Sequence, residues 1–129
     1  MQLHHVQLSM HRGEEDAARN FYQEGLGLEE VPKPPALAPR GGCWFRSPAG
    51  SGDRVEIHLG VEDGFTASAK AHPAFVLNSR AELDAMAERI QRLNMEVSWK
   101  EEFTFEGYSR FHAKDPFGNR LEFLAVAER

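Results

Sequence analysis

The sequence predicts an α+β fold made of two βαβββ units, at about residues 1–60 and 71–126 of a single domain. The first observation is an internal repeat, because a β-rich stretch, a helix pattern and three extended stretches follow one another twice. The second is a pair of equivalent stretches, DRVEIHLG and NRLEFLA, each standing after a turn rich in Gly, Asp or Asn. A chain of 129 residues is long enough for one ordinary core, which favours a single domain.

The first unit begins with a β-rich stretch at residues 3–10. Residues 13–28 are expected to form a helix, because acidic side chains occupy its first turn, where the helix dipole favours them. Gly25 is expected to end this helix. Short extended stretches follow at residues 27–32, 41–47 and 53–60.

The second unit begins with the extended stretch 71–77. Ser79 and Glu82 have the spacing of a capping box, which predicts the start of a helix over residues 80–94. Asn94 suits the left-handed conformation that ends many helices. The apolar stripe of this helix consists of Leu83, Met86, Ile90 and Leu93. Extended stretches follow at residues 95–100, 108–114 and 119–125.

Composition argues against several classes of partner. The net charge is −5 and the basic residues are scattered, so neither nucleic acid nor a membrane surface is an expected partner. The chain shows no signal peptide and no transmembrane stretch, and its lone cysteine, Cys43, cannot form an intramolecular disulfide. We therefore expect a cytoplasmic protein in which Cys43 packs in the core rather than acting as a nucleophile.

Three stretches resemble a known superfamily. The most specific is FHAKDPFGNRLEFL at residues 111–124, and LHHVQL at 3–8 and AARNFYQEGLGLEEV at 17–31 support it. The chain resembles the vicinal oxygen chelate superfamily, also called the glyoxalase/bleomycin-resistance/dioxygenase group. The resemblance implies that the two units form a barrel-like, mostly antiparallel sheet around a concave site, with the helices outside. It also implies a divalent metal ion in that site.

The resemblance places metal ligands on the first and last strands of each unit. Carried over to this sequence, the ligands are His5, His72 and Glu122, with His58 as the fourth. Glu56 competes with His58, because strand alternation puts both side chains on one face. Such a set of imidazoles and carboxylates suits Fe, Mn, Ni, Co or Zn. Glu122 and Glu56 are the candidates for taking or returning a proton during catalysis.

Each of these residues also has a purely structural interpretation. Glu122, for example, would be tolerated in a half-buried strand if it formed an ion pair with Arg54 or Arg120. The occurrence of all four residues at the four expected places favours metal binding over separate structural roles.

Candidate substrate-binding residues lie near the last two strands. Tyr108 and Arg110 fall in a region that the superfamily often uses to close over its substrate. His112 can reach the site as an acid–base group, although we expect an exposed side chain there. Trp44 and Phe103 can line an apolar pocket, with core packing as the alternative.

The resemblance implies a metal-dependent enzyme acting on a small molecule, with lyase, isomerase or dioxygenase chemistry left open. Glyoxalase I, extradiol dioxygenases and fosfomycin thiol transferases are the candidate types. The alternative from another class is a drug-binding protein of the bleomycin-resistance type, which binds its ligand without chemistry. Single-chain members of this size usually form homodimers, so a homodimer is expected.

Overall fold

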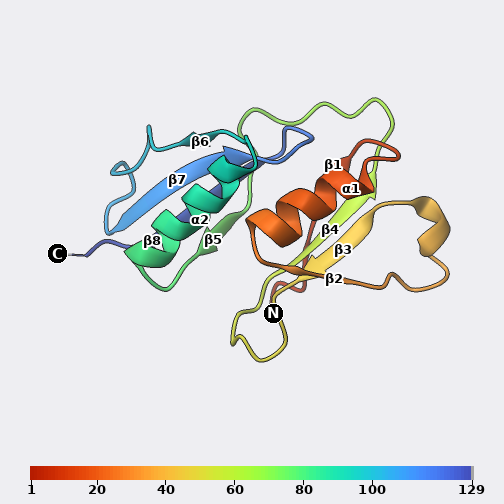
Figure 1. The fold of residues 1–129 in the computed structure, drawn as a ribbon, viewed down its shortest axis with the longest axis horizontal. Helices are drawn as coiled ribbons and strands as arrows, with labels where there is room; N and C mark the ends of the chain where they lie inside the picture. The colour runs from red at the N-terminus through yellow and green to blue at the C-terminus, as the bar shows by residue number, and fades with distance from the viewer. Residues whose placement is uncertain (129) are drawn as a thin grey trace. The chain divides into compact units, whose positions relative to one another are not determined.

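The computed structural model describes residues 1–128 and divides the chain into two compact units, Met1–Ala67 and Ser68–Arg129. Each unit contains one four-stranded sheet and helical segments, which confirms the predicted α+β class and the two βαβββ modules (Figure 1). The sheets are curled rather than closed into a barrel. The elements of the first unit are β1 (Val6–Met10), α1 (Glu15–Arg19), η1 (Asn20–Gly25), β2 (Glu29–Val31), η2 (Ala38–Arg40), β3 (Cys43–Arg46) and β4 (Glu56–Val61). Those of the second are β5 (Ala74–Val76), α2 (Arg80–Arg92), β6 (Val97–Ser98), β7 (Tyr108–Lys114) and β8 (Arg120–Val126).

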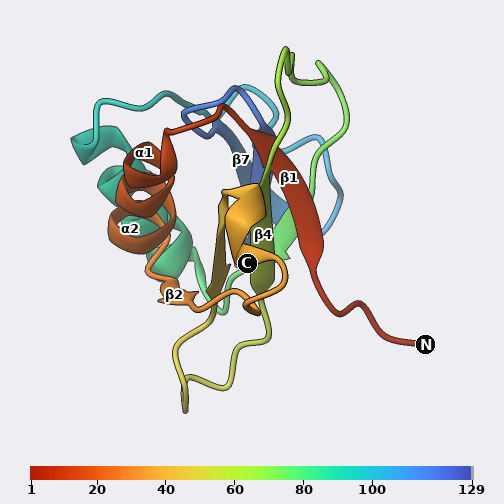
Figure 2. The same ribbon diagram turned by 90° about the vertical axis from the view of Figure 1, so that its right-hand side faces the viewer.

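The sheet of the first unit has the strand order β1-β4-β3-β2. The first strand, β1, pairs in parallel with β4, and the two run side by side in Figure 2. The other two pairs are antiparallel. The pairing sets Gln7 opposite His58 and Trp44 on the other side of His58, so these three side chains share one face of the sheet.

The opposite face of this sheet packs on the first helix. Phe21 and Tyr22 in η1 are fully buried, and the Tyr22 ring stacks on Phe45 of β3 at a centroid distance of 5.4 Å. The helical segment η1 ends at Gly25 as predicted, and the backbone turns left-handed two residues later at Gly27, where φ is 76°. Glycine adopts that conformation without the Cβ clash that other residues suffer, which explains its use at this place.

The sheet of the second unit repeats the pattern with the order β5-β8-β7-β6. Its helix, α2, begins at the predicted cap, where the Ser79 hydroxyl accepts a hydrogen bond from Glu82 N at 3.1 Å. The Glu82 carboxylate in turn accepts from Asn78 N, one residue before the expected partner. The left-handed Asn94, with φ at 61°, follows the helix as predicted. Three predicted stripe residues, Leu83, Met86 and Ile90, are buried.

The core of the second unit lies between α2 and the central strands β7 and β8. Phe111 and Phe123 stack at a centroid distance of 5.0 Å, and Leu121 is fully buried beside them. Because side chains alternate along a strand, burying Leu121 and Phe123 on this side sends Glu122 to the other face.

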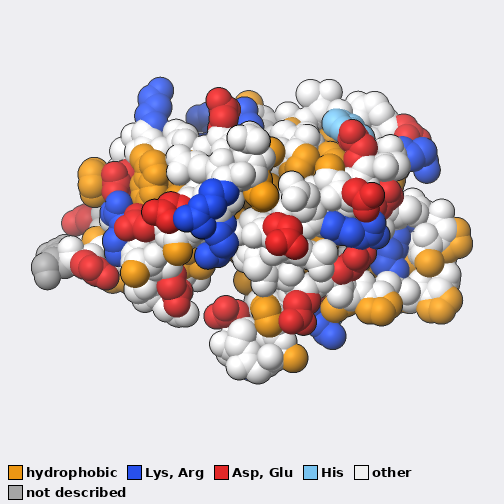
Figure 3. Space-filling view, in the orientation of Figure 1, with side chains coloured by type: hydrophobic (Ala, Val, Ile, Leu, Met, Phe, Trp, Pro, Cys, Tyr) orange, Lys and Arg blue, Asp and Glu red, His pale blue; other side chains and the backbone are white. Residues whose placement is uncertain are grey.

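The surface carries charges of both signs. Figure 3 shows Lys and Arg side chains interspersed with Asp and Glu on the face it presents. Several form exposed ion pairs, such as Arg12 with Asp63 and Arg80 with Asp84. None of the helices in the described part of the chain has the length and apolar character needed to cross a bilayer.

Candidate metal centre

Strand pairing brings three potential metal ligands together in the second unit. Glu122 lies in the middle of β8, and His112 of β7 is its partner across the antiparallel pair. Ala74 of β5 pairs with Glu122 from the other side, and His72 precedes Ala74 by two residues on the same face. The sheet register alone therefore converges His72, His112 and Glu122.

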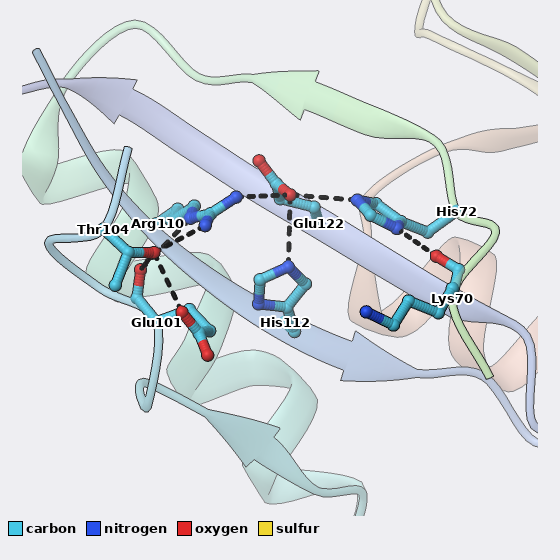
Figure 4. Close-up of polar contacts among 7 residues, drawn as sticks. All are labelled: Lys70, His72, Glu101, Thr104, Arg110, His112 and Glu122. Carbon is cyan, nitrogen blue, oxygen red and sulfur yellow. Dashed lines mark hydrogen bonds and ion pairs between the residues drawn. The ribbon is translucent and has the colours of Figure 1, made fainter. Parts of the chain in front are cut away.

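Three side chains meet at one oxygen of the Glu122 carboxylate, as Figure 4 shows. Glu122 Oε1 lies 3.0 Å from His72 Nε2, 3.1 Å from His112 Nε2 and 3.1 Å from Arg110 Nη1. One potential ligand atom each from His72, His112 and Glu122 lies within 4.8 Å of the other two. The second carboxylate oxygen takes part in none of these three bonds. Glu122 itself is only 2% exposed, so these partners stabilise a buried charge.

Backbone and hydroxyl groups hold two of these partners in place. His72 Nδ1 lies 2.6 Å from the carbonyl oxygen of Lys70. Arg110 donates from Nε to the Glu101 carbonyl at 3.1 Å and from Nη2 to Thr104 Oγ1 at 2.6 Å. Both side chains are therefore oriented by contacts beyond Glu122, which limits the conformational freedom lost when a ligand binds.

The charge states of the cluster follow from burial and from its charged neighbours. Burial alone raises the pKa of the Glu122 carboxyl, but the His72 hydrogen bond and Arg110 outweigh it, so this pKa lies below its ordinary value. Burial lowers the pKa of His112, and the positive charge of Arg120 acts in the same direction. At neutral pH the cluster thus offers an anionic carboxylate beside an uncharged imidazole at His112.

The donor chemistry of His72 tests whether the cluster suits a metal ion. A neutral imidazole has one N–H, yet the two nitrogens of His72 face a carbonyl oxygen and a carboxylate oxygen. The carbonyl can only accept, so Nδ1 donates to it. The ionised carboxylate also only accepts, so Nε2 is satisfied either by a second proton or by a cation bound between it and Glu122. Two imidazoles and one carboxylate form a donor set found with Fe, Mn, Ni, Co and Zn. The residues fit a divalent metal.

The first unit contains a second group of potential ligands. His4, His5 and Glu56 each offer one ligand atom, and these atoms lie within 4.8 Å of one another. The two imidazoles lie 2.9 Å apart between their Nδ1 atoms, and His4 Nδ1 is 3.7 Å from Glu56 Oε2. His4 is exposed and Glu56 is partly so. This group is thus more open to solvent than the cluster of the second unit.

His58 lies beside that group in a stack of rings. Its ring is parallel to Trp44 at 3.8 Å and nearly parallel to His5 at 3.9 Å. Its Nε2 lies 2.9 Å from Glu56 Oε2, and its exposed fraction is 3%. Burial lowers the pKa of His58, so the imidazole is neutral at neutral pH and can donate one hydrogen bond to Glu56.

A family model described as the Glyoxalase/Bleomycin resistance protein/Dioxygenase superfamily matches residues 2–123. The chain belongs to this superfamily. The resemblance of its sequence to the glyoxalase/bleomycin-resistance/dioxygenase group is thereby confirmed. Among curated proteins, no relative matches the sequence.

Solved structures of the superfamily are similar over almost the whole chain. A glyoxalase family protein from Bacillus anthracis is 38% identical, with a TM-score of 0.82 covering 98% of this chain and 96% of that one. The fosfomycin resistance protein FosX from Listeria monocytogenes is 20% identical, with a TM-score of 0.74 over 98% of this chain and 94% of its own. A Glu-to-Gln variant of FosX, complexed with Mn(II) and 1S,2S-dihydroxypropylphosphonic acid, is 23% identical with a TM-score of 0.71, covering 98% and 90% of the two chains. At these identities the likeness to FosX shows the fold alone.

The ligands predicted from the sequence are distributed over both units. His72 and Glu122 are in contact in the second unit. His5, His58 and Glu56 are neighbours in the first unit, where Glu56 rather than His58 belongs to the group of converging ligand atoms. The joint four-ligand set, and the choice between His58 and Glu56, stay predictions.

The surroundings of Glu122 differ in two ways from what the sequence suggested. His112 is buried, with 7% exposure, rather than exposed, because β7 is an inner strand and its register points His112 at Glu122. The structural alternative for Glu122, an ion pair with Arg54 or Arg120, is not what the structure shows, because its arginine partner is Arg110. The sequence did hold a signal for both, since Arg110, His112 and Glu122 lie on one face once the two strands are paired.

The other candidates for substrate binding occupy different surroundings. Tyr108 and Arg110 belong to strand β7, and Phe105 contacts both of them, edge-on to the Tyr108 ring and 5.6 Å below the Arg110 guanidinium. Phe103 is 77% exposed and Trp44 lies in the ring stack on His58. Their role in substrate binding stays a prediction.

Two further residues complete the picture of the site candidates. His4 was missed as a member of the first group, although the adjacent histidines in LHHVQL were a visible signal. Cys43 is buried, and burial is the main cause that raises its pKa to about 12. A thiol with that pKa is protonated at neutral pH, which agrees with a packing role.

Proposed function

We propose that this chain is a metal-dependent enzyme of the glyoxalase/dioxygenase type that acts on a small molecule. The observation that carries the proposal is the cluster of the exposed His72 with the buried His112 and Glu122, whose ligand atoms lie within 4.8 Å of one another. A buried carboxylate that faces one imidazole on the neighbouring inner strand and another just before the edge strand β5 suits a divalent metal better than a purely structural role.

The residues of the chain have distinct tasks in this proposal. The Lys70 carbonyl fixes the proton of His72 on Nδ1 and leaves Nε2 to bind the metal. The lowered pKa of Glu122 keeps the carboxylate charged, which makes it a good ligand and a weak proton acceptor. Arg110 holds the carboxylate in position from the side away from His72, and the buried His112 supplies a neutral third donor (Figure 4).

When bound, the metal would act as a Lewis acid that polarises a substrate oxygen and stabilises developing negative charge. The fold family gives this idea support. The FosX variant holds Mn(II) together with a molecule that carries two neighbouring hydroxyl groups. A glyoxalase/dioxygenase from Nostoc punctiforme shares the fold at a TM-score of 0.74 and 21% identity, over 98% of this chain and 92% of its own. Lyase, isomerase and dioxygenase reactions on oxygen-bearing substrates are the candidate activities.

Metal titration of chelator-treated protein tests the proposal. We expect one Mn(II) ion per chain to bind at the cluster of His72, His112 and Glu122, as followed by electron paramagnetic resonance. His72→Gln should weaken that binding by about tenfold or more, since even partners outside the coordination shell are worth roughly 10- to 100-fold. The matched control is His11→Gln, which changes a surface histidine that contacts Glu14.

Two results would decide against the proposal. One is the absence of Mn(II), Fe(II), Ni(II), Co(II) or Zn(II) binding by the wild-type protein, and the other is equal binding by His72→Gln. The first result would favour the alternative, a non-catalytic drug-binding protein of the bleomycin-resistance type, and the second would exclude the cluster of His72, His112 and Glu122 as the metal site. We further propose a homodimer, for which sedimentation at micromolar concentration should give twice the mass of the 14.6 kDa chain.

A further inference from the structure

A hollow of about 300 Å³ lies beside the candidate metal ligands of the second unit. His112 forms part of its wall and contacts Glu122 through Nε2, so the hollow adjoins the cluster around Glu122. The hollow is lined by Glu96, Ser98, Lys100, Glu101, His112, Ala113, Lys114 and Arg120. Its volume is at the lower end of the range of small-molecule sites.

The strand register forces two cations together at this hollow. Lys114 of β7 and Arg120 of β8 are direct partners across the antiparallel pair, so their side chains leave the same face of the sheet. Like charges placed directly opposite each other destabilise a sheet. Arg120 is also half-buried, which adds a desolvation cost to the repulsion.

The carboxylates of the hollow do not neutralise this pair. Within residues 1–128, the side chains of Lys114, Arg120 and Lys100 form no ion pair and no hydrogen bond. The Glu101 carboxylate accepts a hydrogen bond from Thr104 Oγ1 at 2.9 Å, while Glu96 is exposed. Three cations therefore face two carboxylates across the hollow.

The corresponding place in the first unit is built differently. There the strand partners are Arg46 of β3 and Glu56 of β4, which carry opposite charges. The two pairs occupy equivalent places. Arg120 precedes Glu122 by two residues on β8, and Glu56 precedes His58 by two residues on β4. The like-charged pair of the second unit is thus a local feature and not a requirement of the repeated fold.

Arg110, the other cation of this face, is already occupied. It donates to the Glu122 carboxylate, the Glu101 carbonyl and the Thr104 hydroxyl. The guanidinium and ammonium groups that remain available to a ligand are those of Arg120, Lys114 and Lys100, on the opposite side of His112 along β7.

We propose that Lys114 and Arg120, with Lys100 and Ser98 beside them, form a binding site for an anionic group of a small molecule. A carboxylate, phosphate or phosphonate shares the required chemistry, because each accepts charge-assisted hydrogen bonds from guanidinium and ammonium groups. The inference rests on the proposed function in one respect. The molecule is taken to be the substrate, and its oxygen reaches the metal site of His72, His112 and Glu122 on the other side of His112.

The test uses chelator-treated, full-length protein, so that its outcome does not depend on metal binding. Inorganic phosphate and acetate are titrated separately at low ionic strength, with the melting temperature and, for phosphate, the ³¹P line width as readouts. We expect a saturable rise in melting temperature with at least one of the two anions. A larger effect of phosphate assigns the site to phosphate-type ligands, and a larger effect of acetate assigns it to carboxylates.

Variants locate the binding and separate it from general salt effects. Lys114→Gln and Arg120→Gln should each weaken anion binding by about tenfold, the worth of one charge-assisted hydrogen bond. In anion-free buffer the exposed Lys114→Gln should melt at or above the wild-type temperature, because the repulsion with Arg120 is removed. The control, Arg92→Gln, alters an exposed helix residue paired with Glu88 and should bind anions like the wild type.

The proposal is overturned if neither anion stabilises the wild-type protein, or if Lys114→Gln binds them as tightly as the wild type does. Failure of the metal titration with intact anion binding would remove the proposed function and leave the anion site standing. Intact metal binding without anion binding would do the reverse.

Discussion

The two units place different kinds of side chain at the same position of their sheets, His58 in the first and Glu122 in the second. In the first unit, His5 lies two residues before Gln7, the partner of His58 on β4. In the second, His72 lies two residues before Ala74, the partner of Glu122 on β8. The register thus makes His58 the counterpart of Glu122, yet one is a neutral ring in an aromatic stack and the other is a buried anion.

This difference shows that two repeated units can stabilise the same sheet position by different interactions. Stacking of Trp44, His58 and His5 at centroid distances below 4 Å stabilises the first unit through packing, without a charge at the central position. In the second unit, the central position carries the charge of Glu122, which the ion pair with Arg110 stabilises. An anionic ligand that is already held rigidly favours metal binding, so the proposed function assigns the metal to the second unit rather than the first.

The largest effect is expected from exchanging the carboxylates of the two units for amides. Glu122→Gln should weaken Mn(II) binding by about 100-fold or more, because it removes the buried, charged ligand of the cluster. Glu56→Gln, the matched change in the more open first group, should have a smaller effect. Isothermal titration of metal into chelator-treated protein measures both.

The same two variants, Glu122→Gln and Glu56→Gln, can contradict the difference proposed between the two units. Equal losses of affinity would mean that both units contribute equally to a metal site. If Glu122→Gln changed neither metal affinity nor melting temperature, Glu122 would be an ordinary strand residue, and its contacts with His72, His112 and Arg110 would have no functional meaning.

A smaller effect should appear in the pH dependence of the metal-free protein. Burial lowers the pKa of His58 and of His112 from the ordinary value of 6.5. Their contribution to stability is therefore complete above that value and is lost as the pH falls through the lower folded-state pKa values. Glu122 acts in the same sense only below its ordinary value of 4.5. The melting temperature should fall between pH 7 and pH 5.

His58→Phe separates the contributions of the two units to this pH dependence. Phenylalanine preserves a ring between Trp44 and His5 but has no titratable group, so the decrease in melting temperature on acidification should become shallower. Melting curves recorded by circular dichroism across that pH range provide the measurement. An unchanged slope would show that His58 makes no contribution and that the second unit dominates the acid response.

The smallest effect concerns the helix starts. Ser79→Ala should lower the free energy of unfolding by about 1 kcal/mol, because it removes the hydroxyl that accepts from Glu82 N. Glu14 stands at the equivalent place before α1 and makes no capping hydrogen bond. Glu14→Ala should therefore change the free energy by less than about 0.5 kcal/mol, as measured by urea unfolding. A loss as large as that of Ser79→Ala would contradict the assigned caps.

Local sequence patterns were sufficient for most of the fold. Ser79, Glu82 and Asn94 act on their near neighbours in the chain, so the start and end of α2 were visible in the sequence. The same holds for the repeated order of elements, which alternation and turn residues determine.

The site was harder to predict because its contacts join distant segments. Glu122 meets Arg110 and His112 through the register of β7 against β8, and no property of either residue alone reveals that they are partners. The preference for an exposed His112 treated it as an average strand residue. Pairing the two strands first, and only then assigning faces, would have placed it correctly.

The orientation of His72 has a consequence for how this part of the chain can change. The ring is held by the carbonyl oxygen of Lys70, a group that every amino acid possesses. Substitutions at position 70 can therefore accumulate without disturbing the imidazole. Inserting or deleting a single residue between positions 70 and 72 would shift that carbonyl away from Nδ1. Here the chain length between two points is under constraint, while the identity of the side chain is not.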